Sequence, residues 1–272
     1  MIPRAVLTFW REYHAPWPGD DQVEQDLILS RVLIELFSDE LIAESLAFRG
    51  GTALNKLFLP SMSRYSEDID LVKTRAEPIG PVMGRIKEIL GPWLGKPKYK
   101  QKENMVTFYF SYLAEPPMER PMRLKVEINT RENFSVYGYE MRELEVKTDW
   151  FAGSAAIKTF SLDELLGTKL RALYQRKKGR DLFDPWICKS TLSVDPERVV
   201  QAFLEYMNRG GVTITRAEFE ENLLKKIEDA AIRTDIAPLL RETVEYDLDG
   251  AAEYMLNDIV SRLPGKPWKR PD

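Results

Sequence analysis

The sequence predicts an α+β fold, in which a mixed sheet flanked by helices is followed by a C-terminal helical domain. Two observations carry this prediction. Alternating apolar and polar residues, typical of strands, are confined to the first half of the chain, where helical patterns lie between them. After Gly153 the alternation gives way to successive patterns of helical period. We therefore expect a mixed α/β half over about 1–150 and a helical half over about 155–272, joined by a turn at 151–154.

Helical periodicity in the first half predicts helices over 20–45, 52–59 and 81–94. Apolar and alternating runs predict strands over 46–48, 68–73, 105–112, 122–128 and 144–147. In the second half, Ser161 and Glu164 form a capping box that starts a helix directed toward Arg176. Further helices are expected over 180–189, 195–208, 215–230, 235–246 and 247–262.

The composition excludes several classes of function. The 272 residues contain one cysteine, Cys188, and one histidine, His14, so an internal disulfide and a Cys- or His-rich zinc site cannot form. A serine or cysteine hydrolase would depend on His14, which lies in an irregular Tyr-His-Ala-Pro segment that predicts a turn. The net charge of −4 argues against a passive nucleic-acid coat, although a local basic patch could still bind a nucleic-acid substrate.

The chain shows no signal for a membrane. The N-terminal residues lack the apolar run of a signal peptide, and no stretch approaches the about 20 apolar residues that span a bilayer. A cytoplasmic protein without a membrane partner is therefore expected.

The most informative segment runs from Phe48 to Val72. Gly50 and Gly51 follow a short apolar run and open a predicted helix, whose N-terminal amides suit phosphate groups. Asp68 and Asp70 lie one residue apart on a predicted strand, so their side chains point to the same face. Adjacent carboxylates repel each other unless a cation lies between them, and oxygen ligands suit Mg²⁺ bound together with substrate phosphates. The segment therefore predicts a metal–nucleotide site.

The glycine segment is not a P-loop. That loop requires glycine directly before its lysine and Ser or Thr directly after it, whereas Asn55 and Leu57 flank Lys56 here. Lys56 and Arg64 could contact phosphates or could be surface cations, and Ser66 flanks the two aspartates.

A third carboxylate, Glu127, lies inside the predicted strand 122–128, between apolar residues that face the opposite way. A buried acid without a partner is costly, so Glu127 is best explained beside a metal and the two aspartates. The alternative is a solvent-facing residue on an edge strand.

These acids and glycines resemble the DNA polymerase β-like nucleotidyltransferase superfamily, whose signature is a glycine pair, then Asp-x-Asp, then a third acid on a later strand. More narrowly, the chain resembles the AbiEii/AbiGii toxin family, including its MenT-like members. The matching blocks, in order along the chain, are Phe48-Arg-Gly-Gly-Thr-Ala-Leu-Asn-Lys56, Ser66-Glu-Asp-Ile-Asp-Leu71, Leu165-Leu-Gly-Thr-Lys-Leu-Arg-Ala-Leu173 and Arg176-Lys-Lys-Gly-Arg-Asp-Leu-Phe-Asp184.

The resemblance implies a nucleotidyltransferase fold and a metal-dependent transferase, the toxin of a bacterial toxin–antitoxin or abortive-infection system. Asp68 and Asp70 would then be metal ligands, Lys169 would contact the nucleotide, and Asp181 or Asp184 would be a late essential acid. Some members add nucleotides to the 3′ end of tRNA, and others are described as GTP-binding.

Several roles in the second half remain open from sequence. Lys169 lies on the apolar side of its helix, so it either reaches solvent or meets an anion such as a triphosphate. Asp181 could instead stabilise a helix N-terminus, and Asp184 could pair with Arg180. The densest basic cluster, with aromatic residues among its members, could bind RNA or could complement a helix end; it comprises Arg171, Arg176, Lys177, Lys178 and Arg180 in addition to Lys169.

The resulting hypothesis is an enzyme that transfers a nucleoside monophosphate from an NTP to an acceptor, expected to be the 3′ end of tRNA. Mg²⁺, or Mn²⁺ in its place, would be held by Asp68, Asp70 and Glu127, and an antitoxin would be the protein partner. The expected catalytic residues are Asp68, Asp70, Glu127, Lys169, Asp181 and Asp184, and the expected nucleotide-binding residues are Gly50, Gly51, Thr52, Lys56, Ser66 and Lys169. The alternatives are transfer to a small molecule or a protein hydroxyl, and an NTP-binding module without turnover.

Overall fold

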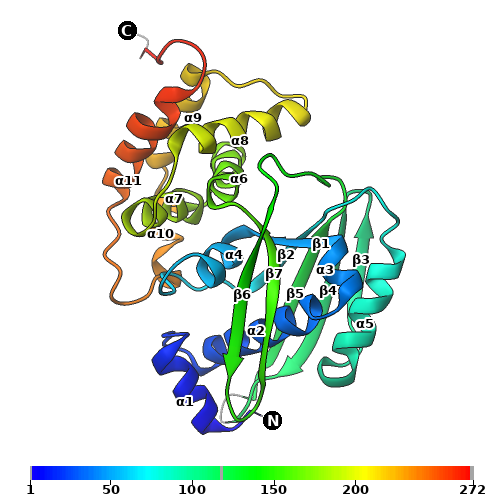
Figure 1. The fold of residues 1–272 in the computed structure, drawn as a ribbon. Helices are drawn as coiled ribbons and strands as arrows, with labels where there is room; N and C mark the ends of the chain where they lie inside the picture. The colour runs from blue at the N-terminus through cyan, green and yellow to red at the C-terminus, as the bar shows by residue number, and fades with distance from the viewer. Residues whose placement is uncertain (1, 117–118, 270–272) are drawn as a thin grey trace. The chain divides into compact units, whose positions relative to one another are not determined.

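The computed structural model describes residues 2–116 and 119–269, and it divides into two compact units, Met1–Phe160 and Ser161–Asp272. The first unit combines a sheet with helices, whereas helices make up the second (Figure 1). Among the described residues, no helix has both the length and the apolar character needed to cross a membrane.

In the described residues of the first unit, seven strands form one sheet in the order β3-β4-β5-β2-β1-β7-β6 (Figure 1). β2 pairs with β5 and β1 pairs with β7 in parallel, and the other neighbours are antiparallel, which confirms the predicted mixed sheet. The strands are β1 (Leu46–Arg49), β2 (Asp68–Lys73), β3 (Lys98–Lys102), β4 (Met105–Leu113), β5 (Pro121–Asn129), β6 (Tyr139–Lys147) and β7 (Ala152–Phe160).

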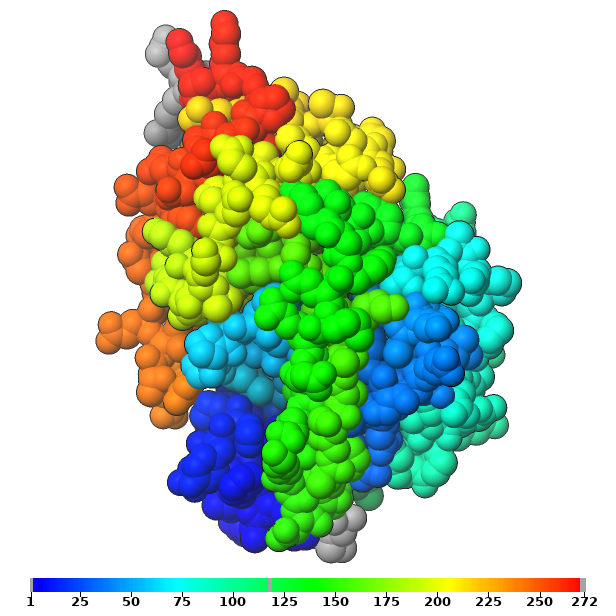
Figure 2. Space-filling view, viewed as in Figure 1, coloured from blue at the N-terminus to red at the C-terminus, as the bar shows by residue number. Residues whose placement is uncertain are grey.

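The sequence did not predict two of these strands, β3 and β7, and the turn expected at 151–154 is wrong. Residues 152–154 belong to β7, which pairs with β6 along its whole length and with β1 at Phe48. Alanine and glycine are poor strand formers, so tertiary pairing overrides local preference in this segment. The β6–β7 hairpin lies at the surface of the first unit in the view of Figure 2.

Helices cover one face of the sheet. Tyr112 on β4 donates a hydrogen bond to Gln25 of α2, and Lys87 of α5 lies over the rings of Tyr99 and Phe108. The predicted helix over 20–45 is divided, because Asp39 accepts a hydrogen bond from the Ile42 amide and starts a new helix. The helices are α1 (Arg4–Tyr13), α2 (Asp20–Phe37), α3 (Glu40–Ser45), α4 (Gly50–Leu57) and α5 (Gly80–Leu94).

The second unit is built around α6. Its buried leucines pack against α7, α8 and α9, and the side chain of Ser161 accepts a hydrogen bond from the Glu164 amide, as half of the predicted capping box requires. The elements are α6 (Leu162–Gln175), α7 (Gly179–Thr191), α8 (Pro196–Arg209), α9 (Arg216–Ile227), α10 (Ala230–Thr234), η1 (Ala237–Leu239), α11 (Leu248–Tyr254), η2 (Met255–Ile259) and η3 (Val260–Arg262).

The predicted helix over 235–246 is wrong. Within residues 235–246 of the described chain, the helical structure is limited to the single 3₁₀ turn η1. Residues 237–246 are all exposed or half-buried. Pro238 lacks an amide donor, and the packing of this segment is confined to its ends, where Ile236 is buried and the Tyr246 ring contacts Phe183. Between these ends there is no continuous apolar face to support a helix.

Candidate functional site

Two glycines open α4 directly after β1. Gly50 has a φ of +84°, and a β-carbon there would collide with the carboxylate of Asp70. A β-carbon on Gly51 would collide with the guanidinium of Arg64, a side chain that is almost fully buried. Position 50 therefore requires glycine for its positive φ, and at Gly51 a side chain would have to displace the buried Arg64 guanidinium.

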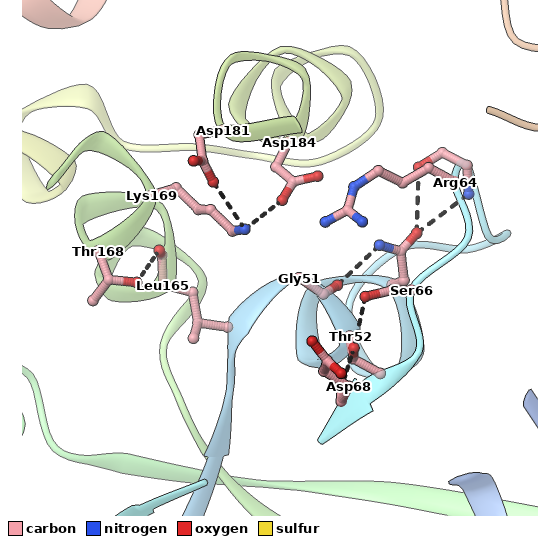
Figure 3. A network of polar contacts seen from close by, with 12 residues as sticks. Gly51, Thr52, Arg64, Ser66, Asp68, Leu165, Thr168, Lys169, Asp181 and Asp184 are labelled. Atoms are coloured by element: carbon pink, nitrogen blue, oxygen red, sulfur yellow. Dashed lines mark hydrogen bonds and ion pairs between the residues drawn. The ribbon is translucent and has the colours of Figure 1, made fainter. Parts of the chain in front are cut away.

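Thr52 fastens α4 to the start of β2 (Figure 3). Its hydroxyl donates to the carbonyl oxygen of Asp68 at 2.6 Å and lies 2.7 Å from the hydroxyl of Ser66. Since the single Thr52 proton goes to Asp68, Ser66 must donate to Thr52. These two hydroxyls therefore fix the backbone from which the Asp68 carboxylate extends.

The predicted acids lie on two neighbouring parallel strands. Asp70 on β2 is the register partner of Glu127 on β5, and Asp68 is the partner of Lys125. The alternate residues of both strands, including Ile69 and Val126, are fully buried on the opposite face. Asp68, Asp70 and Glu127 therefore share the less buried face of the sheet, and we call them the carboxylate row.

β5 lies between β4 and β2, so Glu127 is not on an edge strand. Thr107 of β4 donates a hydrogen bond to the Glu127 carboxylate at 3.3 Å. The expectation of an edge strand is therefore wrong for Glu127, although its side chain keeps 26% of its surface exposed.

Lys125 also belongs to this site, although no motif in the sequence identifies it. Its ammonium lies 3.0 Å from the carboxylate of Asp68 and 2.9 Å from that of Glu127. Partial burial lowers the pKa of Lys125, but hydrogen bonds to Glu127 and Asp68 outweigh burial and raise that pKa above the usual lysine value. Its position two residues before Glu127, on the same face of a strand, was the signal that could have identified it.

The carboxylate row fits a cation. One positive group, the Lys125 ammonium, already bridges Asp68 and Glu127, and the side chains of these acids keep 35% and 26% of their surface exposed. Within residues 2–116 and 119–269, no three or more Asp, Glu, His or Cys side chains converge into a ready-made metal cage. The donor set is nonetheless the all-oxygen kind that suits Mg²⁺.

Lys56 is enclosed instead of facing a ligand. Its ammonium bonds the carboxylate of Asp26 at 2.7 Å and the hydroxyl of Ser30 at 2.8 Å, with 3% of the side chain exposed. Burial lowers the pKa of Lys56, and Asp26 partly offsets this effect. Neither expected role, phosphate ligand or surface cation, agrees with this burial, so we do not include Lys56 in the proposed nucleotide site.

The acids and the lysine expected in the second unit form a closed ion cluster (Figure 3). Lys169 lies 2.8 Å from the carboxylate of Asp184 and 3.5 Å from that of Asp181. Asp181 also accepts two hydrogen bonds from Arg176, at 2.7 and 2.9 Å. Side-chain exposure is 8% for Lys169, 0% for Asp181 and 2% for Asp184, whereas Arg176 keeps 48% of its side chain exposed. We call these four residues the ion cluster; three of them are buried between α6 and α7, and Arg176 covers the cluster from the surface.

The expected RNA-binding cluster is partly neutralised within the second unit. Arg176 bonds Asp181, Lys177 lies 2.7 Å from Asp229, and the Arg171 guanidinium stacks 5.0 Å above the ring of Tyr206. Lys178 is exposed and Arg180 half-buried.

Comparison with known proteins identifies the family of this chain. The family model described as "Nucleotidyl transferase AbiEii toxin, Type IV TA system" matches residues 31–254. No curated protein matches the sequence significantly.

Among solved structures, the chain is similar to MenT4, a nucleotidyltransferase toxin from Mycobacterium tuberculosis, with a TM-score of 0.69 and 17% identity over 97% of this chain and 91% of that one. It is also similar to JHP933 from Helicobacter pylori, with a TM-score of 0.56 and 17% identity over 89% of this chain and 91% of that one. At these identities the similarity shows a shared fold.

Proposed function

Because the chain belongs to the family of AbiEii nucleotidyltransferase toxins, we propose that it transfers a nucleoside monophosphate from an NTP to the 3′ end of tRNA. The observation that carries this proposal is the carboxylate row beside the glycine-opened N-terminus of α4. The family is described as part of a type IV toxin–antitoxin system, so a cognate antitoxin is the protein partner we expect.

Asp68, Asp70 and Glu127 would hold Mg²⁺, or Mn²⁺ in its place, because their oxygens match the ligand preference of these ions. When bound, such an ion neutralises the triphosphate and stabilises charge on the attacking and leaving oxygens. The amides of Gly50 and Gly51 would bind phosphate oxygens at the N-terminus of α4.

The proposed transfer is a displacement at the α-phosphorus. The terminal hydroxyl oxygen of the acceptor forms a bond to that phosphorus, and the bond to the bridging oxygen of the β-phosphate breaks, which releases pyrophosphate. The hydroxyl proton passes to the carboxylate of Glu127, whose hydrogen bonds to Lys125 and Thr107 hold it in a fixed position.

We propose that Lys169 of α6 binds a phosphate group and that Asp184 holds the Lys169 ammonium in place. An ammonium has three N–H donors, and the two aspartates use two of them, which leaves one for a phosphate oxygen. Asp181 is fully buried and accepts two hydrogen bonds from Arg176, so we assign it a structural role.

The proposal is tested by incubating the full chain and Mg²⁺ with each α-labelled NTP in turn, first with total tRNA and then alone. We expect label from at least one NTP on tRNA, and none on tRNA treated with Asp68→Ala. If only the protein or only a small molecule is labelled, tRNA is not the acceptor, and the labelled molecule takes its place in the proposal. NTP binding without pyrophosphate release under any condition would refute the proposed transfer.

A further inference from the structure

The face of the sheet that carries the carboxylate row continues outward to the edge strand β3. Residues paired across neighbouring strands point to the same side of a sheet. Two rows of partners therefore extend from the acids to the edge: Asp68, Lys125, Tyr109 and Lys98, and Asp70, Glu127, Thr107 and Lys100.

This outer part of the sheet is open and basic. Lys98, Lys100 and Lys102 are exposed, and none of them forms an ion pair with any residue that the structure describes. On the interior strands, the exposed guanidinium of Arg123 stacks 4.8 Å from the ring centroid of Tyr109. We call these five residues the basic sheet face. The opposite side of β4 is closed by packing, since Phe108 and Phe110 are fully buried.

The basic sheet face differs from the cationic cluster of the second unit. There, Arg176 and Lys177 are paired with Asp181 and Asp229, so much of their charge is neutralised. In a chain of net charge −4, three unpaired lysines on one side of the edge strand β3, with Arg123 of β5 on the same side, are an uncompensated positive surface.

Lysines on an edge strand also prevent edge-to-edge association. That role depends on the strand's free backbone and not on which face the side chains occupy. It therefore explains neither why Lys98, Lys100 and Lys102 all lie on the side of the acids nor why Arg123 and Tyr109 extend the surface inward.

We infer that the basic sheet face binds the single-stranded end of an RNA, with the lysines on its phosphates and a base stacked on the Arg123–Tyr109 pair. Unpaired bases stack on aromatic rings and on guanidinium planes, and lysines neutralise the backbone. Neighbouring strands lie about 4.8 Å apart, so β3 is about 14 Å from the row on β2, a span that a few nucleotides cover. The inference rests on the proposed function for the acceptor's identity.

Binding is measured by fluorescence anisotropy on the full chain without NTP, using labelled tRNA and a labelled single-stranded RNA. The test variant carries Lys98→Gln, Lys100→Gln and Lys102→Gln. The control carries Lys147→Gln, Lys225→Gln and Lys266→Gln, which are exposed lysines outside the basic sheet face. Both variants change the net charge equally, from −4 to −7 by the loss of three lysines.

We expect the test variant to bind both RNAs on the order of 10-fold more weakly. Its salt-dependence slope should fall by about 2, because each phosphate that a lysine no longer neutralises lowers the slope by about 0.7. The control should retain wild-type affinity and slope. A third variant, Lys98→Arg, Lys100→Arg and Lys102→Arg, keeps the positive charges and should also retain the wild-type affinity and slope. Equal unfolding temperatures would show that all variants fold. Tyr109→Ala should weaken binding, whereas Tyr109→Phe, which keeps the ring, should not.

The outcomes separate the inference from the proposed function. If tRNA is labelled but the test and control variants share one Kd and one KM for tRNA, the inference is overturned and the function stands. If RNA binding depends on the basic sheet face while no RNA is labelled, the inference stands and the acceptor is wrong. If the test variant loses only affinity for an antitoxin, the face binds protein and the inference fails.

Discussion

The carboxylate row of the first unit and the ion cluster of the second unit use the same residue types in opposite ways. In the row, Asp68 and Glu127 share one ammonium, that of Lys125, and all three side chains are 26–35% exposed. In the cluster, Asp181, Asp184 and Lys169 are at most 8% exposed, and Arg176, which is 48% exposed, pairs with Asp181 from the surface. A partly exposed group of carboxylates can accept a cation, whereas buried carboxylates that are already paired with cations mainly fix the geometry of the helices that carry them.

The largest expected effect is on the row. Asp68→Asn should lower nucleotidyl transfer by at least about 1,000-fold, because stabilisation by a bound metal ion is worth several kcal/mol. The unfolding temperature should change little, since Asp68 is partly exposed. Asp149→Asn, an exposed control in the same unit, should leave transfer unchanged. If Asp68→Asn transfers nucleotides as fast as Asp149→Asn does, the carboxylate row has no part in the reaction.

The next effect is on the cluster and concerns stability. Asp181→Asn should destabilise folding by about 3–5 kcal/mol, because it leaves Lys169 with one acid fewer and Arg176 without its bidentate partner. Urea unfolding measures the change. Asp249→Asn breaks an exposed pair with Arg233 and should cost less than about 1 kcal/mol. Similar losses in the two variants would mean that the cluster is no more structural than a surface pair.

A smaller effect is expected at Lys125, whose ammonium lies between the carboxylates of Asp68 and Glu127. Lys125→Met removes the ammonium that competes for Asp68 and Glu127, so Mn²⁺ should bind on the order of 10-fold more tightly. Without metal the variant should unfold at a lower temperature, because the acids lose their cation. Mn²⁺ titration followed by electron paramagnetic resonance tests the first effect, and weaker Mn²⁺ binding would show that Lys125 supports the ion.

The smallest effect concerns pH and the second unit. The Lys226 ammonium donates to the carbonyl oxygens of Leu173 and Tyr174 at the end of α6, and burial lowers its pKa to about 8. Between pH 8 and about 10.5 the unfolded chain keeps a proton that the folded chain has released, so stability rises with pH. Relative to Lys226→Met, the wild type should gain about 1–2 kcal/mol over this range, less than the full shift implies because water still screens the amine. The free energy of unfolding in urea is measured against pH for both proteins. If the two profiles run parallel, the pKa of Lys226 is not lowered.

The sequence predicts what depends on local periodicity. Asp68 and Asp70 share a face because a strand alternates with period two, and the same rule separates Glu127 from its buried neighbours. The glycine pair is also informative from local sequence, since Gly50 adopts a positive φ and Asp70 and Arg64 approach the two glycines closely.

The sequence does not predict partners that come from distant elements. Lys56 meets Asp26 of α2 across 30 positions, and Lys125 meets Asp68 only because β5 lies beside β2. β7 was missed because Ala152 and Gly153 have weak strand preference and depend on β6 for pairing. The helix expected over 235–246 does not form, because only its two ends, at Ile236 and Tyr246, reach the core and the residues between them have no buried side chain.

The most direct test is where the cation binds. Mn²⁺ binding to the full chain is measured by equilibrium dialysis for the wild type, Asp68→Asn and Asp184→Asn, each variant removing one carboxylate charge. We predict that Asp68→Asn loses Mn²⁺ binding and that Asp184→Asn retains it. Wild-type binding by Asp68→Asn, or loss of binding by Asp184→Asn alone, would contradict the assignment of the metal to the carboxylate row.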